Sequence, residues 1–296
     1  MGTHPMNHPL PRFEGRSPGG LHILSDGILI AFFMKAPHRK IGHVVHRAWD
    51  LYQRHTGQEK LAYYTGTEGI VPIDNWARSD IKERLLNADG CLLELWEHDD
   101  QLGGYRVEYR GRMLDQPPYA HEPEAVSGVA FWLPTDYLEQ QGPARVKELA
   151  LALARELPFN TGYVSPAFNG LMDMQMVRPL IHDLCFRYPG LDIFDSEVTR
   201  RLGTRPKGAY WLNFYGPPLL NELGGVTGLA ERLPGLSVQQ FAPDKVLVEL
   251  GDWPEVDGDM PAYRQLARVL EPHLYQETRP PLPPEDMRRW ERRFLD

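Results

Sequence analysis

The stretch AYWLNFYGPPLLNELGG, Ala209–Gly225, decides how the second half of this chain folds. Its first residues are apolar and aromatic and predict a strand, which the Gly-Pro-Pro that follows brings to an end. The apolar residues after the prolines predict a short helix, and the double glycine supplies the left-handed residue that commonly ends one. Strand, glycine turn and helix also build many active sites. Only Asn213 and Tyr215 offer chemistry here, and neither has a partner nearby in the sequence, so we interpret the stretch as a structural corner.

Apolar strands and amphipathic helices alternate on both sides of this corner. Apolar spacing of three and four residues predicts helices over 38–55, 70–87, 143–158, 174–190, 217–225, 260–275 and at the C-terminus. Short β-rich runs predict strands over 60–65, 90–99, 105–111, 126–134, 161–169 and 208–216. Two hairpins are expected, over 236–251 and over 21–34, the latter with its turn at Asp26-Gly27. This order predicts an α+β fold with mixed, mainly antiparallel sheets covered by helices in two intertwined lobes.

The chain divides into three parts by composition. Residues 1–19 are polar and rich in Pro and Gly, which predicts a flexible N-terminal segment. Residues 20–275 are expected to form a single domain of two lobes, and a division near residue 125 or near residue 200 stays open. Residues 276–296 read as a Pro-rich connector and a terminal helix.

The bulk composition is that of a globular protein in a reducing compartment. The 296 residues are 42% hydrophobic and 24% charged, and the longest apolar run, Ile28–Met34, is too short to span a bilayer. No apolar core of a signal peptide is present near the N-terminus, so we expect a cytoplasmic protein. The only cysteines, Cys91 and Cys185, lie far apart in apolar runs and are predicted to be buried free thiols. The formal net charge of -8 argues against a general nucleic-acid binder, because phosphate contacts need clustered Lys and Arg, but it suits a basic partner.

The sequence contains no assembled catalytic set. It lacks a P-loop, a GxGxxG loop and a GxSxG elbow. His38, His43 and His46 follow one another on the first predicted helix, but no HExxH pattern completes a zinc site, so we interpret them as solvent-facing or capping residues. We therefore predict a protein that is not an enzyme and that needs no cofactor or metal. A metal-dependent hydrolase that uses carboxylates or these histidines remains the less favoured alternative.

Two segments are strongly acidic. Residues 89–125 hold nine carboxylates against three arginines, a net charge of -6, and residues 244–259 hold six carboxylates against one lysine, a net charge of -5. A solvated surface explains such segments, and electrostatic docking of a basic protein is the sharper alternative. Trp253, beside a proline in an acidic loop, is the strongest single choice for an exposed aromatic anchor. The residues that we predict to bind a partner are Glu97, Asp99, Asp100, Asp252, Trp253, Glu255, Asp257 and Asp259.

Several blocks of this sequence resemble the TsiV-like family of type VI secretion immunity proteins. The most specific block is GAYWLNFYGPPLLNELGG (208–225), and the others are GYVSPAFN (162–169), VLVELGDWPEVDGD (246–259), AFWLPTDYL (130–138) and the start at 21–34. Together they span most of residues 20–275. The resemblance supplies no catalytic residues and no binding motif that maps position by position, so the partner-binding residues above rest on charge and aromaticity.

The resemblance implies a cytoplasmic protein that binds and neutralises a cognate type VI effector and so protects the producing cell. The effectors paired with this family resemble nucleases of the restriction-endonuclease-like class, which need a basic DNA groove. An acidic partner would fill that groove by electrostatic mimicry of DNA or would simply block its entry. An adaptor or chaperone that loads an effector onto the secretion machine is the alternative function.

Overall fold

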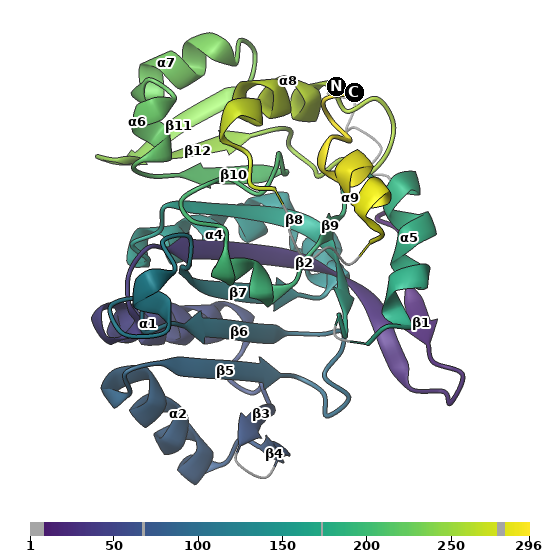
Figure 1. Cartoon of the computed structure of the whole chain (residues 1–296). Coiled ribbons are helices and arrows are strands. Elements are labelled where there is room, and N and C mark those ends of the chain that lie inside the picture. The colour runs from purple at the N-terminus through teal and green to yellow at the C-terminus, as the bar shows by residue number, and fades with distance from the viewer. Residues whose placement is uncertain (1–8, 67–68, 173, 277–281) are drawn as a thin grey trace.

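The computed structural model describes residues 9–66, 69–172, 174–276 and 282–296, and its centre is one large β-sheet (Figure 1). The strands are β1 (Glu14–Arg16), β2 (His22–Met34), β3 (Tyr63–Gly66), β4 (Gly69–Pro72), β5 (Cys91–Trp96), β6 (Arg106–Gly111), β7 (Ser127–Leu133), β8 (Thr161–Gly170), β9 (Asp192–Ile193), β10 (Leu212–Tyr215), β11 (Ser237–Ala242) and β12 (Lys245–Glu249). Their order across the sheet is β11-β12-β10-β8-β2-β7-β6-β5-β3-β4. Neighbours pair antiparallel, β1 joins β2 antiparallel, and β9 joins β8 in parallel.

Helices pack around this sheet. They are α1 (His38–Thr56), α2 (Asn75–Asn87), α3 (Thr135–Gln141), α4 (Pro143–Glu156), α5 (Val177–Arg187), α6 (Leu219–Glu222), α7 (Gly225–Arg232), α8 (Pro261–Leu270) and α9 (Pro284–Glu291). Short 3-10 turns lie at Tyr119–His121, Ser196–Arg200 and Glu271–His273. The predicted α+β class and the mainly antiparallel sheet are therefore confirmed. Among the described residues, no helix is both long enough and apolar enough to cross a membrane.

The sheet is covered on both faces around β2. Alternate side chains of a strand point to opposite faces, and those of Ile28, Ile30 and Phe32 pack in one core with α1, α2 and α4. Those of Leu29, Ala31 and Phe33 face the other way, into a second core that the segment Phe194–Tyr210 helps to form. Burial on both faces explains why this strand is an almost continuous apolar run.

The hairpin predicted over 21–34 is wrong, because β2 runs through Asp26-Gly27 as one strand. The Asp26 carboxylate accepts hydrogen bonds from the backbone N–H of Phe13 (2.8 Å) and the hydroxyl of Thr135 (2.6 Å). Gly27 leaves room for a neighbour, since a Cβ there would lie 3.3 Å from the ring of Trp132. Tertiary contacts, rather than a turn, therefore explain this dipeptide.

The structural corner at 209–225 is confirmed. After β10, helix α6 ends at Glu222, and α7 begins at Gly225, directly after Gly224, which has a φ of 86°. The Asn213 side chain accepts a hydrogen bond from the Tyr210 N–H (2.9 Å) and donates one to the Tyr210 carbonyl (2.6 Å), so it holds the approach to the strand in place. Tyr215 is buried.

The two cysteines behave as predicted. Cys91 and Cys185 are free and buried. Burial raises the pKa of the Cys91 thiol to about 11 and that of Cys185 to about 12. Both thiols therefore stay protonated near neutral pH and are poor nucleophiles.

Helices α5 and α9 lie side by side (Figure 1), and a histidine joins them. His182 on α5 places Nδ1 2.9 Å from an oxygen of Asp183 and Nε2 3.2 Å from an oxygen of Asp286 on α9. The hydrogen bonds to these carboxylates, Asp183 first, raise the pKa of His182. Because its folded pKa lies above the unfolded value of about 6.5, the imidazolium stabilises the fold fully below that pH, and this contribution is lost as the pH rises through the folded pKa.

We therefore expect the wild-type protein to be more stable than a His182→Gln variant at about pH 6, and the two to converge at about pH 8.5. Urea denaturation at both pH values measures the difference. A His43→Gln variant is the control, because this exposed histidine makes no ion pair with the described residues. A difference between wild type and His182→Gln that does not change with pH contradicts the prediction.

Candidate partner-binding surface

The predicted partner-binding residues lie in two loops at one edge of the sheet. The β5–β6 loop spans residues 97–105 and the β12–α8 loop spans residues 250–260. The register pairs Trp96 with Arg106, Ile28 with Leu133 and Leu212 with Glu249, so both loops leave the sheet at the same edge. Six strand-to-strand steps separate β5 from β12, which corresponds to about 29 Å at about 4.8 Å per step. The two loops therefore share an edge but do not form one compact site.

Ion pairs neutralise most of the first acidic segment. Five of the nine carboxylates in residues 89–125 lie within 4.0 Å of an Arg or Lys nitrogen: Glu94–Arg110, Glu97–Lys60, Glu108–Arg106, Asp115–Arg39 and Glu124–Arg205. A sixth, Asp100, lies 3.5 Å from His22. The charge counted from the sequence is therefore largely internal to the fold here.

The β12–α8 loop keeps its charge. Asp252, Glu255 and Asp257 are exposed, and none of them has a cationic nitrogen of the described residues within ion-pair distance. Asp259 is also exposed and lies 3.6 Å from Arg264. Partial burial raises the pKa of Glu255. The three unpaired carboxylates make this loop the stronger of the two candidates for contact with a basic partner.

The backbone of the β12–α8 loop is anchored to the fold at two points. The Trp211 indole N–H donates to the Gly251 carbonyl (2.9 Å), and the Gly190 N–H donates to the Val256 carbonyl (3.0 Å). Gly190 permits this approach, because a Cβ there would lie 2.2 Å from the carbonyl oxygen of Glu255. The loop therefore holds its carboxylates on a fixed backbone, which lowers the entropy lost on binding.

Trp253 is not the exposed anchor that we predicted. Its side chain is only partly accessible and packs against the main core, and its indole N–H is buried without a hydrogen-bond partner among the described residues. The Pro254 that follows is buried as well. The acidic sequence around Trp253 could not show that the ring turns inward, because that depends on the neighbouring segments that anchor the loop.

The acidic residues of the β5–β6 loop mostly hold the loop itself. The Glu97 carboxylate accepts a hydrogen bond from the Tyr105 N–H (3.1 Å) and lies 3.4 Å from the Lys60 ammonium. The Asp100 carboxylate accepts one from the Leu102 N–H (3.2 Å). Asp99 is exposed. Of this group, Asp99 alone is exposed and has no ion pair or side-chain hydrogen bond with the described residues.

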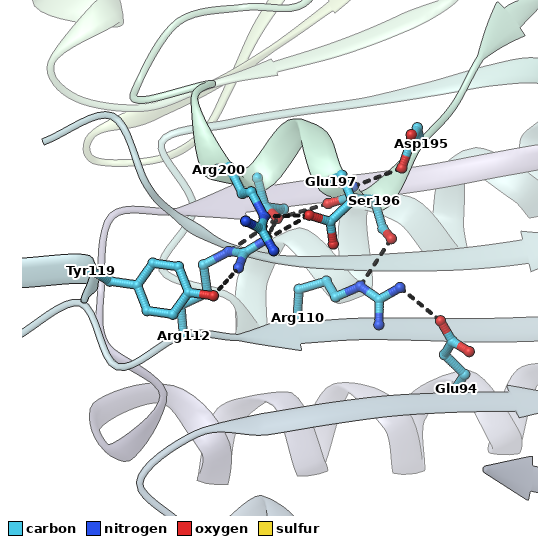
Figure 2. Close-up of polar contacts among 9 residues, drawn as sticks. Glu94, Arg110, Arg112, Tyr119, Asp195, Ser196, Glu197 and Arg200 are labelled. Carbon is cyan, nitrogen blue, oxygen red and sulfur yellow. Dashed lines mark hydrogen bonds and ion pairs between the residues drawn. The ribbon is translucent and has the colours of Figure 1, made fainter. Parts of the chain in front are cut away.

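Sequence reasoning missed two arginines, Arg110 on β6 and Arg112 directly after it, that fix the segment Ser196–Arg200 over the sheet (Figure 2). Arg110 donates to the Ser196 hydroxyl (2.9 Å) and to Glu94 (2.8 Å). Arg112 is buried and donates to the hydroxyls of Thr199 (2.6 Å) and Tyr119 (2.7 Å). The alternation of Arg and Glu along YRVEYRGR (105–112) signals a charged strand face, but not what covers it. This cluster is structural, since its donors are used within the fold.

The histidines do not assemble a metal site. Within the described parts of the chain, no three His, Cys, Asp or Glu side chains lie close enough together to hold a metal ion. His43 is exposed, as expected, and His46 lies 3.3 Å from Asp50. His38 corrects the prediction, because it is buried and forms hydrogen bonds with the Tyr109 hydroxyl (2.8 Å) and the Arg84 carbonyl (3.1 Å). Desolvation lowers the pKa of His38, so a neutral ring links α1 to the sheet and to α2.

Comparison with known proteins identifies the family. No curated protein matches the chain in sequence. Among solved structures, the type VI secretion system (T6SS) protein PA0821 of Pseudomonas aeruginosa is similar in fold, with a TM-score of 0.81, 18% sequence identity and coverage of 97% of this chain and 88% of that one. The model of the TsiV family, described as type VI immunity for VRR-NUC, matches residues 44–294. A match over this much of the chain shows that the protein belongs to the TsiV family of type VI immunity proteins.

Proposed function

We propose that this protein binds and neutralises a secreted nuclease effector of the VRR-NUC type and so protects the cell that makes both. The family match over residues 44–294 carries this proposal. The protein acts by binding rather than by catalysis, in the cytoplasm, where the DNA substrate of such a nuclease lies. The effector is a protein partner, and neither a nucleic acid nor a membrane takes part in the binding.

The β12–α8 loop is the part of the surface best suited to that partner. A nuclease that acts on DNA needs Lys and Arg along its groove to contact phosphates. Asp252, Glu255 and Asp257 are exposed and unpaired among the described residues, so they are available to such cations. We propose that this loop makes the principal contact and that Glu97, Asp99 and Asp100 of the β5–β6 loop make a second one. Occupation of the groove by carboxylates excludes DNA.

Co-expression with the effector tests the proposed function. Cells that produce a VRR-NUC effector encoded beside this gene should stop growing, and growth should return when this protein is also made. The purified protein should form a complex that survives gel filtration, and it should stop cleavage of plasmid DNA at equal molar amounts. Failure to form a complex with such an effector contradicts the proposal. Loss of effector secretion on deletion, without harm to sister cells, supports the adaptor alternative.

A further inference from the structure

A polar cavity of about 420 Å³ lies beside the β5–β6 loop. Its walls come from the C-terminal end of α1 with the residues that follow it, from the β5–β6 loop, and from α3 and α4. At about 30 Å³ for each water molecule, the volume is large enough for a long side chain. Of the residues proposed above to contact the effector, Glu97 alone lines this cavity.

Two tyrosines and a carboxylate line the cavity. The rings of Tyr105 and Tyr137 have centroids 6.3 Å apart and stand at 85° to each other. Burial, together with the nearby Glu97 and Tyr137, raises the pKa of Tyr105 to about 12, so its phenol is uncharged. The Tyr137 hydroxyl is buried and makes no hydrogen bond of normal geometry with the described residues, although the Arg145 guanidinium approaches it. Aromatic faces and a carboxylate together favour a cation.

A cation of the chain itself already occupies this environment. The Lys60 ammonium lies 5.2 Å from the centre of the Tyr105 ring and 3.4 Å from the Glu97 carboxylate. The Lys60 side chain is 46% exposed and sits just after a turn at Gly57, whose carbonyl accepts its backbone N–H. An exposed ion pair of this length contributes little to stability, so a better-fitting cation can displace it. Arg145, by contrast, has its own carboxylate in Glu148 at 2.6 Å.

We propose that this cavity receives an arginine side chain of the effector. In the free protein the Lys60 ammonium occupies the same environment, and the arginine displaces it on binding. The inference rests on the proposed function, because the basic groove of a nuclease supplies the arginine. A guanidinium presents five N–H donors in a plane, so it can donate two parallel hydrogen bonds to the Glu97 carboxylate while its flat face lies against Tyr105. Lysine in the same place has a compact ammonium, without the planar pair of donors or the flat face.

A small-molecule probe tests the cavity without the effector. Nuclear magnetic resonance titration of the full-length protein with N-acetyl-L-arginine methylamide should shift the signals of the β5–β6 loop, whereas the uncharged citrulline analogue should not. Lys60→Ala should bind the arginine probe about threefold or more tighter, because it removes the competing ammonium, and Glu97→Gln about tenfold weaker. Glu156→Gln is the matched control, since it breaks the exposed Glu156–Arg47 pair outside the cavity. Equal binding of both probes, or no gain in Lys60→Ala, overturns the inference.

The effector complex gives the second readout. Tyr105→Leu removes the ring against which the guanidinium lies, and urea denaturation of the variant checks that it still folds. It should weaken the effector complex about threefold, and Glu97→Gln about tenfold, with Glu156→Gln unchanged. If the wild-type complex forms and neither cavity variant weakens it, the cavity proposal is overturned while the proposed function stands. If the wild type forms no complex, the proposed function fails, and the arginine probe still decides whether the cavity binds a guanidinium.

Discussion

A variant with lysine in place of Asp252, Glu255 and Asp257 is expected to associate with the nuclease effector about 10- to 100-fold more slowly than the wild type at low salt. Opposite charges steer two proteins together before they touch, and these three carboxylates have no cation of the described residues to neutralise them. Stopped-flow or surface-binding kinetics at about 50 mM and about 500 mM salt measures the effect, which should shrink at high salt because ions screen exposed charges.

The control for this experiment must change the net charge equally. Lysine at Glu83, Glu231 and Glu285 reverses three exposed glutamates on α2, α7 and α9, outside the β12–α8 loop. This control should slow association much less. If both variants slow association to the same extent, the overall charge, rather than this loop, guides the encounter, and the β12–α8 loop is not the contact surface.

Replacing Lys207 with methionine is expected to lower the free energy of unfolding by about 3 kcal/mol. Asp192 is 1% exposed, and the Lys207 ammonium lies 2.8 and 2.9 Å from its two oxygens. The hydroxyls of Tyr163 (2.6 Å) and Tyr210 (3.0 Å) also donate to this carboxylate. Methionine keeps the apolar stem but leaves the buried carboxylate without the cation that touches it, and an unpaired buried charge is costly.

The double variant Asp192→Asn/Lys207→Met separates the charge from the packing. It removes both members of the pair and leaves an amide whose oxygen accepts one tyrosine hydroxyl and whose NH2 group donates to the other, so it should be clearly more stable than Lys207→Met alone. Urea denaturation measures the free energy of unfolding of the wild type and both variants, with one m-value fitted to all three curves. If the single and double variants are equally unstable, the loss comes from side-chain packing and not from the buried charge.

The sequence predicted local structure well where side-chain spacing alone decides it. The helix α4 and the strands β7 and β12 follow from apolar spacing and flanking prolines or turns. The cap of α2 is local in the same way, because Asp74 stands directly before the helix and accepts the Ala77 N–H at 2.8 Å. The Asp26-Gly27 dipeptide led to the wrong prediction of a hairpin turn. Its role depends on Trp132 and Thr135, which are far away in the sequence.

The candidate surface was harder to predict than the fold. Both acidic segments looked alike in net charge, yet arginines and lysines from distant segments pair with most of the first one and with few residues of the second. The inward turn of Trp253 and the tyrosine cavity beside Glu97 also arise from elements that are separated in the chain. A charge count cannot detect these pairings, since it carries no distances.

The sequence by itself determined the class of the fold, the corner at 209–225 and the resemblance to an immunity family, because these depend on residue types at short spacing. Only the tertiary structure decided which carboxylates stay free, since pairing depends on atoms within a few ångströms that lie far apart in the chain. It left Asp252, Glu255 and Asp257 unpaired among the described residues, and it placed the Lys60 ammonium over Tyr105 beside Glu97. Local sequence therefore specifies the elements, and their packing selects the surface that can bind.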